Sequence, residues 1–362
     1  MGTVELKGVW KIYDNHFEAV KGISATLNNG EFISLLGPSG CGKTSTLRMI
    51  AGLEDISRGD VFIDGVRVNK LLPGDRNVAM AFESYALYPH LTVYENIAYP
   101  LRIRKIPEAE IKQRVDVLCD SLGITGIKEQ FPSSLSGGAQ QRTGLARALV
   151  RSASLYLLDE VLSHLDSHER AMLRGEIRRV QKLMGLTALF VTHDQLEALA
   201  MSDKIIVLND GELQQIGTPE EIYDTPTNLF VAGFVGEPAM NTMIAERSRS
   251  EGEDFLTIAG QRVSAKAMGL TALPNAESFI LGVRPKNVKF ESGPGSIQGR
   301  VHTFEVLGDF TLASIELNSG DTIFKIGEAG LRLNLDQQVA FAFDPWKVLF
   351  YDRKTTLRIL AQ

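Results

Sequence analysis

The chain has 362 residues, 44% of them hydrophobic, and a formal net charge of −6 at pH 7. This length predicts two or three domains, and the mild negative charge, with lysine and arginine scattered, argues against a nucleic-acid-binding surface. Cys41 and Cys119 are the only cysteines and lack the spacing of a disulfide framework or a metal site, which is typical of a reducing compartment. No stretch approaches the roughly 18 apolar residues that span a bilayer, and no signal-peptide core is present. We therefore expect any membrane association to depend on a partner protein.

Short strands are predicted at the start of the chain, at residues 4–6, 9–13, 23–27 and 31–36. Tyr13 ends the second of these strands and precedes the turn-like pair Asp14-Asn15. A tyrosine in this place can stack on an adenine ring, or it can pack on a core as an ordinary strand aromatic. The residues alone leave both interpretations open.

A phosphate-binding loop is predicted at residues 37–44, which read GPSGCGKT and match the pattern G-x-x-x-x-G-K-T. An apolar strand precedes it and helix formers follow it at residues 46–51. Backbone N–H groups of such a loop surround a phosphate, Lys43 can reach the β- and γ-phosphates, and the Thr44 hydroxyl can hold Mg²⁺. The segment therefore predicts binding of a nucleoside triphosphate. The predicted nucleotide-binding residues are Gly37, Pro38, Ser39, Gly40, Cys41, Gly42, Lys43, Thr44 and Ser45.

The middle of the chain is predicted to be helical. A strand at residues 78–82 leads into residues 83–90, and helical periodicity then extends from 92 to about 127, which indicates a helical insertion in an α/β sheet. The sequence Ser136-Gly137-Gly138 stands at the start of the next helix. Exposed N–H groups there predict a second anion-binding corner.

Two buried strands end in polar residues. Residues 155–158 lead to Asp159 and Glu160, which suit a Mg²⁺ ligand and a carboxylate that polarises water. After a turn at 163–166 and a helix from about 169 to 184, the strand at 187–192 leads to His193, which can donate a hydrogen bond to a γ-phosphate. Alone, such residues are usually structural, but their order after a phosphate loop favours an ATPase site.

Beyond about Pro238 the helical patterns stop. Alternating runs at residues 279–283, 301–306, 311–317 and 338–343 are separated by Gly and Asp turns, which predicts a small all-β, OB-like domain. No stacking aromatics are paired with basic residues there, so a regulatory or scaffolding role is favoured over nucleic-acid binding.

With these motifs in order, the sequence resembles the ATP-binding subunits of ABC importers, of the maltose and carbohydrate-importer type. The resemblance covers essentially the whole chain and includes Gly282-Val283-Arg284-Pro285, which is similar to the family's G-[IV]-R-P. It implies an α/β P-loop ABC ATPase domain at residues 1–237, with a helical subdomain at about 84–150. An all-β, OB-like regulatory domain follows at 238–362.

The resemblance also implies roles for single residues. Tyr13 becomes the adenine-stacking aromatic, Asp159 a Mg²⁺-associated acid, Glu160 the catalytic base and His193 the switch histidine. Residues 135–138 become the signature motif, and residues 163–166 become the loop that couples two subunits. The family forms a head-to-tail dimer, which implies that ATP is held between one chain's phosphate loop and the other chain's Ser136, Gly137 and Gly138.

Four positions depart from the family pattern. Glu83 stands where a glutamine normally touches Mg²⁺ and the attacking water, so it is a predicted metal-site residue with an unusual charge. Ala139 stands in place of a Gln or Glu. Val161 stands in place of a proline, and His164 in place of an asparagine. A carboxylate at position 83 adds negative charge near the γ-phosphate and cannot donate an N–H. We hypothesise that hydrolysis is slowed or that Glu83 is partly protonated, and that two different ATPase subunits form a heterodimer.

Three functions follow as hypotheses. The first is an ATPase that uses ATP and Mg²⁺ to energise import of a sugar, sugar alcohol or glycerol-type solute. The second is a weakly hydrolytic nucleotide-binding subunit in a heterodimer. The third, a soluble ABC ATPase outside transport, is disfavoured by the single phosphate loop and the absence of a long coiled-coil insertion.

The implied partners are a second ATPase subunit, two transmembrane permease subunits and, indirectly, a periplasmic or extracellular solute-binding protein, with no nucleic acid. The implied location is the cytoplasmic face of the bacterial inner membrane, as a peripheral subunit.

Overall fold

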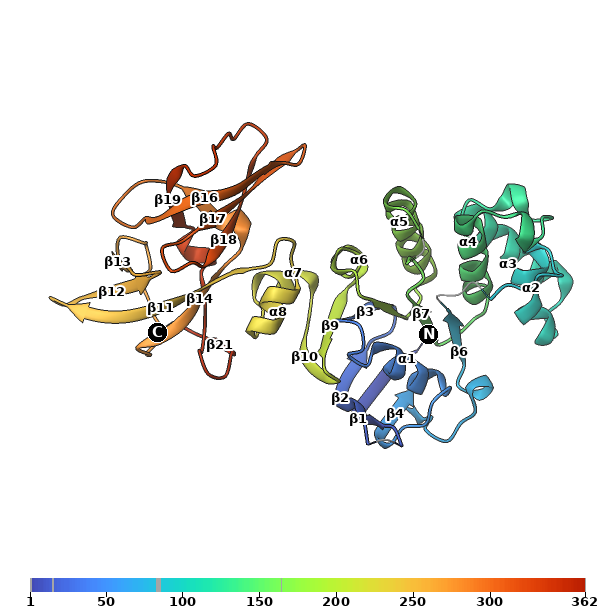
Figure 1. Ribbon diagram of the computed structural model, residues 1–362. Coiled ribbons are helices and arrows are strands. Elements are labelled where there is room, and N and C mark those ends of the chain that lie inside the picture. The colour runs from blue at the N-terminus through green and yellow to red at the C-terminus, as the bar shows by residue number, and fades with distance from the viewer. Residues whose placement is uncertain (1, 15, 83–85, 164, 362) are drawn as a thin grey trace. The chain divides into compact units, whose positions relative to one another are not determined.

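The computed structural model describes residues 2–14, 16–82, 86–163 and 165–361 (Figure 1). The chain forms two compact units that divide between Pro219 and Glu220. This division comes earlier in the chain than the expected boundary at 237/238, because the two short helices before that boundary are hydrogen-bonded to the β-rich unit. Within the described ranges, no helix is long and apolar enough to cross a membrane.

The first unit contains two sheets. The antiparallel sheet has the order β2-β1-β4-β5, and the larger sheet has the order β10-β9-β3-β8-β7-β6. Adjacent strands from β9 to β6 are parallel, so their carboxyl ends lie along one edge, where ligands of α/β sheets bind. The strands are β1 Val4–Ile12, β2 Glu18–Leu27, β3 Phe32–Leu36, β4 Arg58–Ile63, β5 Val66–Arg67, β6 Val78–Ala81, β7 Leu155–Asp159, β8 Ala188–Thr192, β9 Lys204–Asn209 and β10 Glu212–Gly217.

Helices cover the larger sheet and form an insertion. Strands β3 and β8 are buried along their whole length, as expected of parallel strands covered on both faces. The expected helical insertion is confirmed between β6 and β7, where α2, α3 and α4 group together in Figure 1 and share a core with Ile97, Val115 and Leu145. The helices of this unit are α1 Lys43–Ala51, α2 Val93–Ile103, α3 Glu108–Ser121, α4 Gly137–Leu149, α5 Ser167–Met184 and α6 Gln195–Met201, with single 3₁₀ turns at η1 Pro73–Asp75, η2 Thr125–Ile127 and η3 Pro132–Ser134.

The second unit is the expected all-β, OB-like domain, preceded by two short helices. One sheet has the order β13-β12-β11-β14-β20-β21 and the other β15-β19-β16-β17-β18. Their inner faces share a core that includes the fully buried Phe279, Leu281 and Phe341. The elements are α7 Pro219–Asp224, α8 Leu229–Phe234, β11 Asn241–Ser250, β12 Glu253–Ile258, β13 Gln261–Ser264, β14 Ser278–Val283, η4 Pro285–Asn287, β15 Val288–Phe290, β16 Ile297–Val306, β17 Phe310–Glu316, β18 Thr322–Glu328, β19 Gln338–Phe343, η5 Pro345–Lys347, β20 Leu349–Tyr351 and β21 Arg358–Ile359.

Arg284 ties the two short helices to this unit. Its side chain is buried, and its guanidinium donates hydrogen bonds to the carbonyl oxygens of Tyr223, Ala232 and Val235. It also lies 4.3 Å from the centre of the Tyr223 ring. Burial lowers the pKa of Arg284 from its ordinary value. The arginine of the G-V-R-P sequence therefore satisfies the carbonyls at the ends of α7 and α8.

Arg284→Met is expected to destabilise the second unit by about 3 kcal/mol or more, because methionine leaves several buried carbonyls without donors. The matched control is Arg332→Met, since Arg332 donates to the carbonyls of Ala329 and Leu331 at the surface. Urea unfolding of the full chain, followed by circular dichroism and by hydrogen exchange of β14, measures both variants. Equal losses in the two variants would contradict this role of Arg284.

Candidate nucleotide site

The predicted phosphate loop connects β3 to α1, and two of its glycines are required by close packing. A Cβ on Gly37 would lie 2.3 Å from the Leu208 carbonyl oxygen of β9, and a Cβ on Gly42 would lie 2.3 Å from that of Ala19 in β2. Gly42 also has a φ of 95°, in the left-handed region that favours glycine. Helix α1 begins at the next residue, so its first N–H groups face the loop and can bind an anion.

The other loop residues differ in exposure. Lys43 is buried, and its ammonium group donates 2.8 Å hydrogen bonds to the carbonyls of Gly37 and Pro38, which holds it over the loop. Ser39, Gly40 and Thr44 are exposed, so they are accessible to a ligand. Cys41 is buried, and burial raises the pKa of its thiol, which keeps it protonated and is consistent with a packing role.

Tyr13 lies directly after β1 and next to the start of α1. Its hydroxyl donates a 2.7 Å hydrogen bond to the Glu54 carboxylate and lies 3.0 Å from the Ser45 hydroxyl. Burial, followed by the contact with Glu54, raises the pKa of Tyr13. The residue is 36% exposed and lies outside the hydrophobic core, so the core-packing interpretation does not describe it.

Glu160 and His193 are brought together at the carboxyl edge of the large sheet. Strands β7 and β8 are adjacent, and the Glu160 N–H donates to the Val191 carbonyl at 3.0 Å. The His193 Nδ1 lies 3.4 Å from a Glu160 carboxylate oxygen. Glu160 has a φ of 46°, uncommon for a residue with a side chain, and such conformations cluster at functional sites. Asp159 ends β7 at the same edge.

The residues of the signature motif lie at the start of α4. The Ser136 hydroxyl accepts a 3.3 Å hydrogen bond from the Ala139 N–H and so caps the helix, while Ser136 and Gly137 are exposed. A Cβ on Gly138 would lie 3.0 Å from the Glu169 carboxylate. Among the described residues, no hydrogen bond joins positions 136–138 to the phosphate loop of the same chain. The structure thus brings Tyr13 to the phosphate loop and Glu160 to His193. Within the described part of the chain, residues 136–138 are not hydrogen-bonded to that loop.

The residues predicted for Mg²⁺ are a hydroxyl and carboxylates. Thr44 is exposed at the first turn of α1, and Asp159 ends β7, which is separated from β3 by β8 alone. One hydroxyl and one carboxylate fit Mg²⁺, which takes few protein ligands and completes its shell with phosphate oxygens and water. Glu83 and His164 lie outside the described residues.

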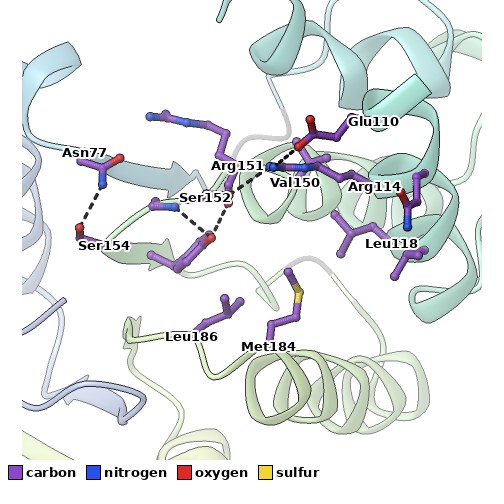
Figure 2. Close-up of a pocket in the computed structure, with 14 residues that line it drawn as sticks. Asn77, Glu110, Arg114, Leu118, Val150, Arg151, Ser152, Ser154, Met184 and Leu186 are labelled. Carbon is purple, nitrogen blue, oxygen red and sulfur yellow. Dashed lines mark hydrogen bonds and ion pairs between the residues drawn. The ribbon is translucent and has the colours of Figure 1, made fainter. Parts of the chain in front are cut away.

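A roomier hollow of about 680 Å³ lies elsewhere in the first unit (Figure 2). Asn77 and Ser154, which line it, directly precede β6 and β7, so it lies at the amino ends of these strands, opposite the phosphate loop. Several of its polar side chains pair with one another: Asn77 donates to Ser154 at 3.0 Å, and Arg114 donates to Ser152 at 3.1 Å and pairs with Glu110. Its position at the amino ends of the strands separates this hollow from the candidate nucleotide site.

Arg170 and Glu197 lie beside Glu160 and His193, although the sequence analysis did not single them out. Both line a small hollow of about 30 Å³ together with those two residues. The available signal was a glutamate in the helix that follows His193, at a position that faces inward. Glu197 is only 3% exposed, which is unusual for a carboxylate unless it is paired.

Comparison with known proteins gives a consistent result. Residues 20–163 match the model of the ABC transporter family, and residues 281–350 match the TOBE domain. The oligosaccharides import ATP-binding protein MsmX of Bacillus subtilis is 40% identical over 369 residues, covering 99% of this chain and 100% of that protein. The trehalose import ATP-binding protein SugC of Mycobacterium tuberculosis is 47% identical over 290 residues, covering 80% of this chain and 73% of that protein. Among solved structures, the dimeric ATP-binding cassette MJ0796 bound to ADP and Pi aligns with a TM-score of 0.55 and 30% identity, covering 60% of this chain and 98% of that one.

Proposed function

The chain belongs to the ABC transporter family and is an ATPase, and from that premise we propose that it energises import of a sugar, a sugar alcohol or a glycerol-type solute. The observation that carries the hydrolytic part of the proposal is the pairing of Glu160 with His193, at 3.4 Å, on the sheet edge next to the predicted phosphate loop. The names of two relatives refer to import of oligosaccharides and of trehalose, which supports a carbohydrate as the solute.

In this proposal the phosphate loop holds the triphosphate. The Lys43 ammonium exchanges its carbonyl acceptors for β- and γ-phosphate oxygens, and the N–H groups at the start of α1 bind the same phosphates. Thr44 and Asp159 would hold Mg²⁺, with the Glu83 carboxylate as a third candidate ligand. When bound, Mg²⁺ supplies charge neutralisation of the phosphates. Tyr13 would stack on the adenine ring.

Glu160 and His193 have separate roles in the proposed hydrolysis. Glu160 accepts a proton from a water whose oxygen attacks the γ-phosphorus, while the bond from that phosphorus to the ADP oxygen breaks. His193 donates a hydrogen bond to the γ-phosphate, and the products are ADP and phosphate. Because His193 is 56% exposed at its side chain, it is accessible to a phosphate at the surface.

A second copy or a second, different ATPase subunit would complete the site. The exposure of Ser136 and Gly137, together with their lack of bonds to the chain's own phosphate loop, supports a head-to-tail dimer in which these donors bind the partner's triphosphate. The departures at Glu83, Ala139, Val161 and His164 support the heterodimer as the alternative. The matching structure MJ0796 is itself dimeric.

The membrane partner would dock on the helical insertion. A groove of about 480 Å³ between this insertion and β6 is lined by exposed apolar side chains, including Tyr88, Tyr99 and Ile103, and by Arg104 and Arg147. An apolar groove with a basic rim suits an amphipathic helix of a permease subunit. Two such permeases would hold the ATPases as peripheral subunits on the cytoplasmic face of the bacterial inner membrane and receive solute from a binding protein.

Uptake in cells tests the proposed transport function. Replacing the native gene by Lys43→Ala is expected to lower uptake of one labelled carbohydrate or polyol by about tenfold or more, because each lost charge-assisted hydrogen bond exceeds about 1.4 kcal/mol. The control is Lys21→Ala, since Lys21 pairs only loosely with Glu212, at 3.9 Å, on the surface. Unchanged uptake of every sugar, sugar alcohol and glycerol-type solute tested would refute the proposal.

A further inference from the structure

Four polar side chains, which we call the Arg170 network, lie beside Glu160 and His193: Arg170, Thr192, Asp194 and Glu197. The Thr192 hydroxyl donates a 2.6 Å hydrogen bond to the Glu197 carboxylate and accepts one from the Asp194 N–H at 3.0 Å. The Arg170 guanidinium lies 3.0 Å from the Asp194 carboxylate and 3.7 Å from that of Glu197. Both sequence neighbours of His193 therefore belong to the network.

The same guanidinium also holds the loop that leaves Glu160. Arg170 donates a hydrogen bond to the Leu165 carbonyl at 3.3 Å. In the same loop, the Ser163 hydroxyl and N–H donate to the Glu160 carbonyl at 2.9 and 3.2 Å. One side chain thus connects the loop after β7 with the segment after β8. These are the two segments that carry Glu160 and His193.

Burial makes the Glu197 carboxylate depend on its partners in the network. Glu197 and Thr192 are 3% and 2% exposed, and a buried carboxylate is tolerated only when it is paired and hydrogen-bonded. Removing the guanidinium would leave Glu197 and Asp194 without the ion pairs that they form with Arg170. The expected response is a shift of the short helix α6 and of His193, which precedes it.

A second arginine of α5 provides a comparison. Arg178 pairs with Asp203, and Asp203 accepts a 2.8 Å hydrogen bond from the Phe32 N–H. Phe32 is at the amino end of β3, away from the phosphate loop. The two arginines are similarly exposed, at 30% and 24% of their side chains. Both attach α5 to the sheet, but Arg170 alone of the two contacts the segments of Glu160 and His193. Substituting each arginine in turn therefore distinguishes the positioning of Glu160 and His193 from general stabilisation of the fold.

We propose that Arg170, acting with Glu197, is a positioning residue for ATP hydrolysis that sets the spacing between Glu160 and His193. It would touch neither the nucleotide nor the attacking water. The proposal rests on the catalytic roles assigned to Glu160 and His193 above. A displacement of about 1 Å in such a pair is enough to lower the rate by about 100-fold.

The test compares Arg170→Met with Arg178→Met in the full-length chain. Arg170→Met is expected to lower kcat for ATP by about 10- to 100-fold with KM within about twofold, because positioning acts on the transition state and leaves binding intact. Arg178→Met is expected to lower the unfolding temperature with little change in kcat. Arg170→Lys, which keeps the charge without the planar group, is expected to recover part of the rate.

A double variant distinguishes positioning from a loss of folded protein. On the Glu160→Gln background, Arg170→Met is expected to lower the residual turnover by less than about threefold, because residues that act as a unit are not additive. Should Arg170→Met fail to fold, Glu197→Gln replaces it, with the same expected split between kcat and KM. Equal effects of Arg170→Met and Arg178→Met on kcat, or full additivity with Glu160→Gln, would overturn the inference. If Glu160→Gln alone leaves turnover intact, the assigned catalytic roles fail instead.

Discussion

Replacing Glu160 by glutamine is expected to lower ATP turnover by about 100- to 10,000-fold, the range that a general base contributes, while ATP affinity stays within a few-fold. Glutamine keeps the size of the side chain and its capacity to hydrogen-bond His193, which lies 3.4 Å away. It cannot accept the proton of the attacking water. The loss should therefore appear in kcat with KM unchanged, measured by phosphate release from the purified membrane complex.

A control variant and a second substitution distinguish a hydrolysing ATPase from a weakly hydrolytic nucleotide-binding subunit. Glu212→Gln changes an exposed carboxylate on β10 and should leave turnover unchanged. Glu83→Gln replaces a carboxylate by an amide that can donate, and it should raise turnover if the negative charge holds hydrolysis back. Nearly intact turnover in Glu160→Gln would instead mean that a partner ATPase carries the chemistry and that this chain mainly binds nucleotide.

Gly42→Ala is expected to weaken ATP binding by about 100-fold or more and to destabilise the fold by roughly 2–4 kcal/mol. The new Cβ would lie 2.3 Å from the Ala19 carbonyl oxygen, and a backbone atom of β2 cannot move aside as a flexible side chain can. The φ of 95° adds strain for any residue with a side chain. Relief would require a shift of the loop that is proposed to hold the phosphates.

Gly40→Ala is the matched control in the same loop. Its φ is 81°, but no atom beyond its chain neighbours lies within 4 Å of the added Cβ, so we expect stability to fall only by the backbone cost of about 1–2 kcal/mol. Thermal unfolding and titration with a fluorescent ATP analogue measure both variants. If Gly42→Ala binds the analogue as tightly as Gly40→Ala, the contact with β2 does not shape the phosphate loop.

Much of the first unit could be predicted from local patterns. The sequence GPSGCGKT between an apolar run and helix formers predicts a strand, a loop and a helix, and β3 and α1 confirm this. Buried strands that end in Asp159 and His193 predict side chains on one sheet edge, since parallel strands share their carboxyl ends. The division between the units was less predictable, because Arg284 binds α7 and α8 through contacts remote in sequence.

The sequence by itself predicted the class of ligand, the order of the elements and the residues proposed to meet phosphate, because these depend on short spacings and on the side-chain period of strands and helices. The tertiary structure alone decided which of these residues meet. It brought Glu160 to 3.4 Å from His193, placed the Ala19 carbonyl where only glycine fits at position 42, and joined Arg170 of α5 to Glu197 of α6. These contacts join residues far apart along the chain or on different helices. Their distances follow from the packing of whole elements, which no local pattern specifies.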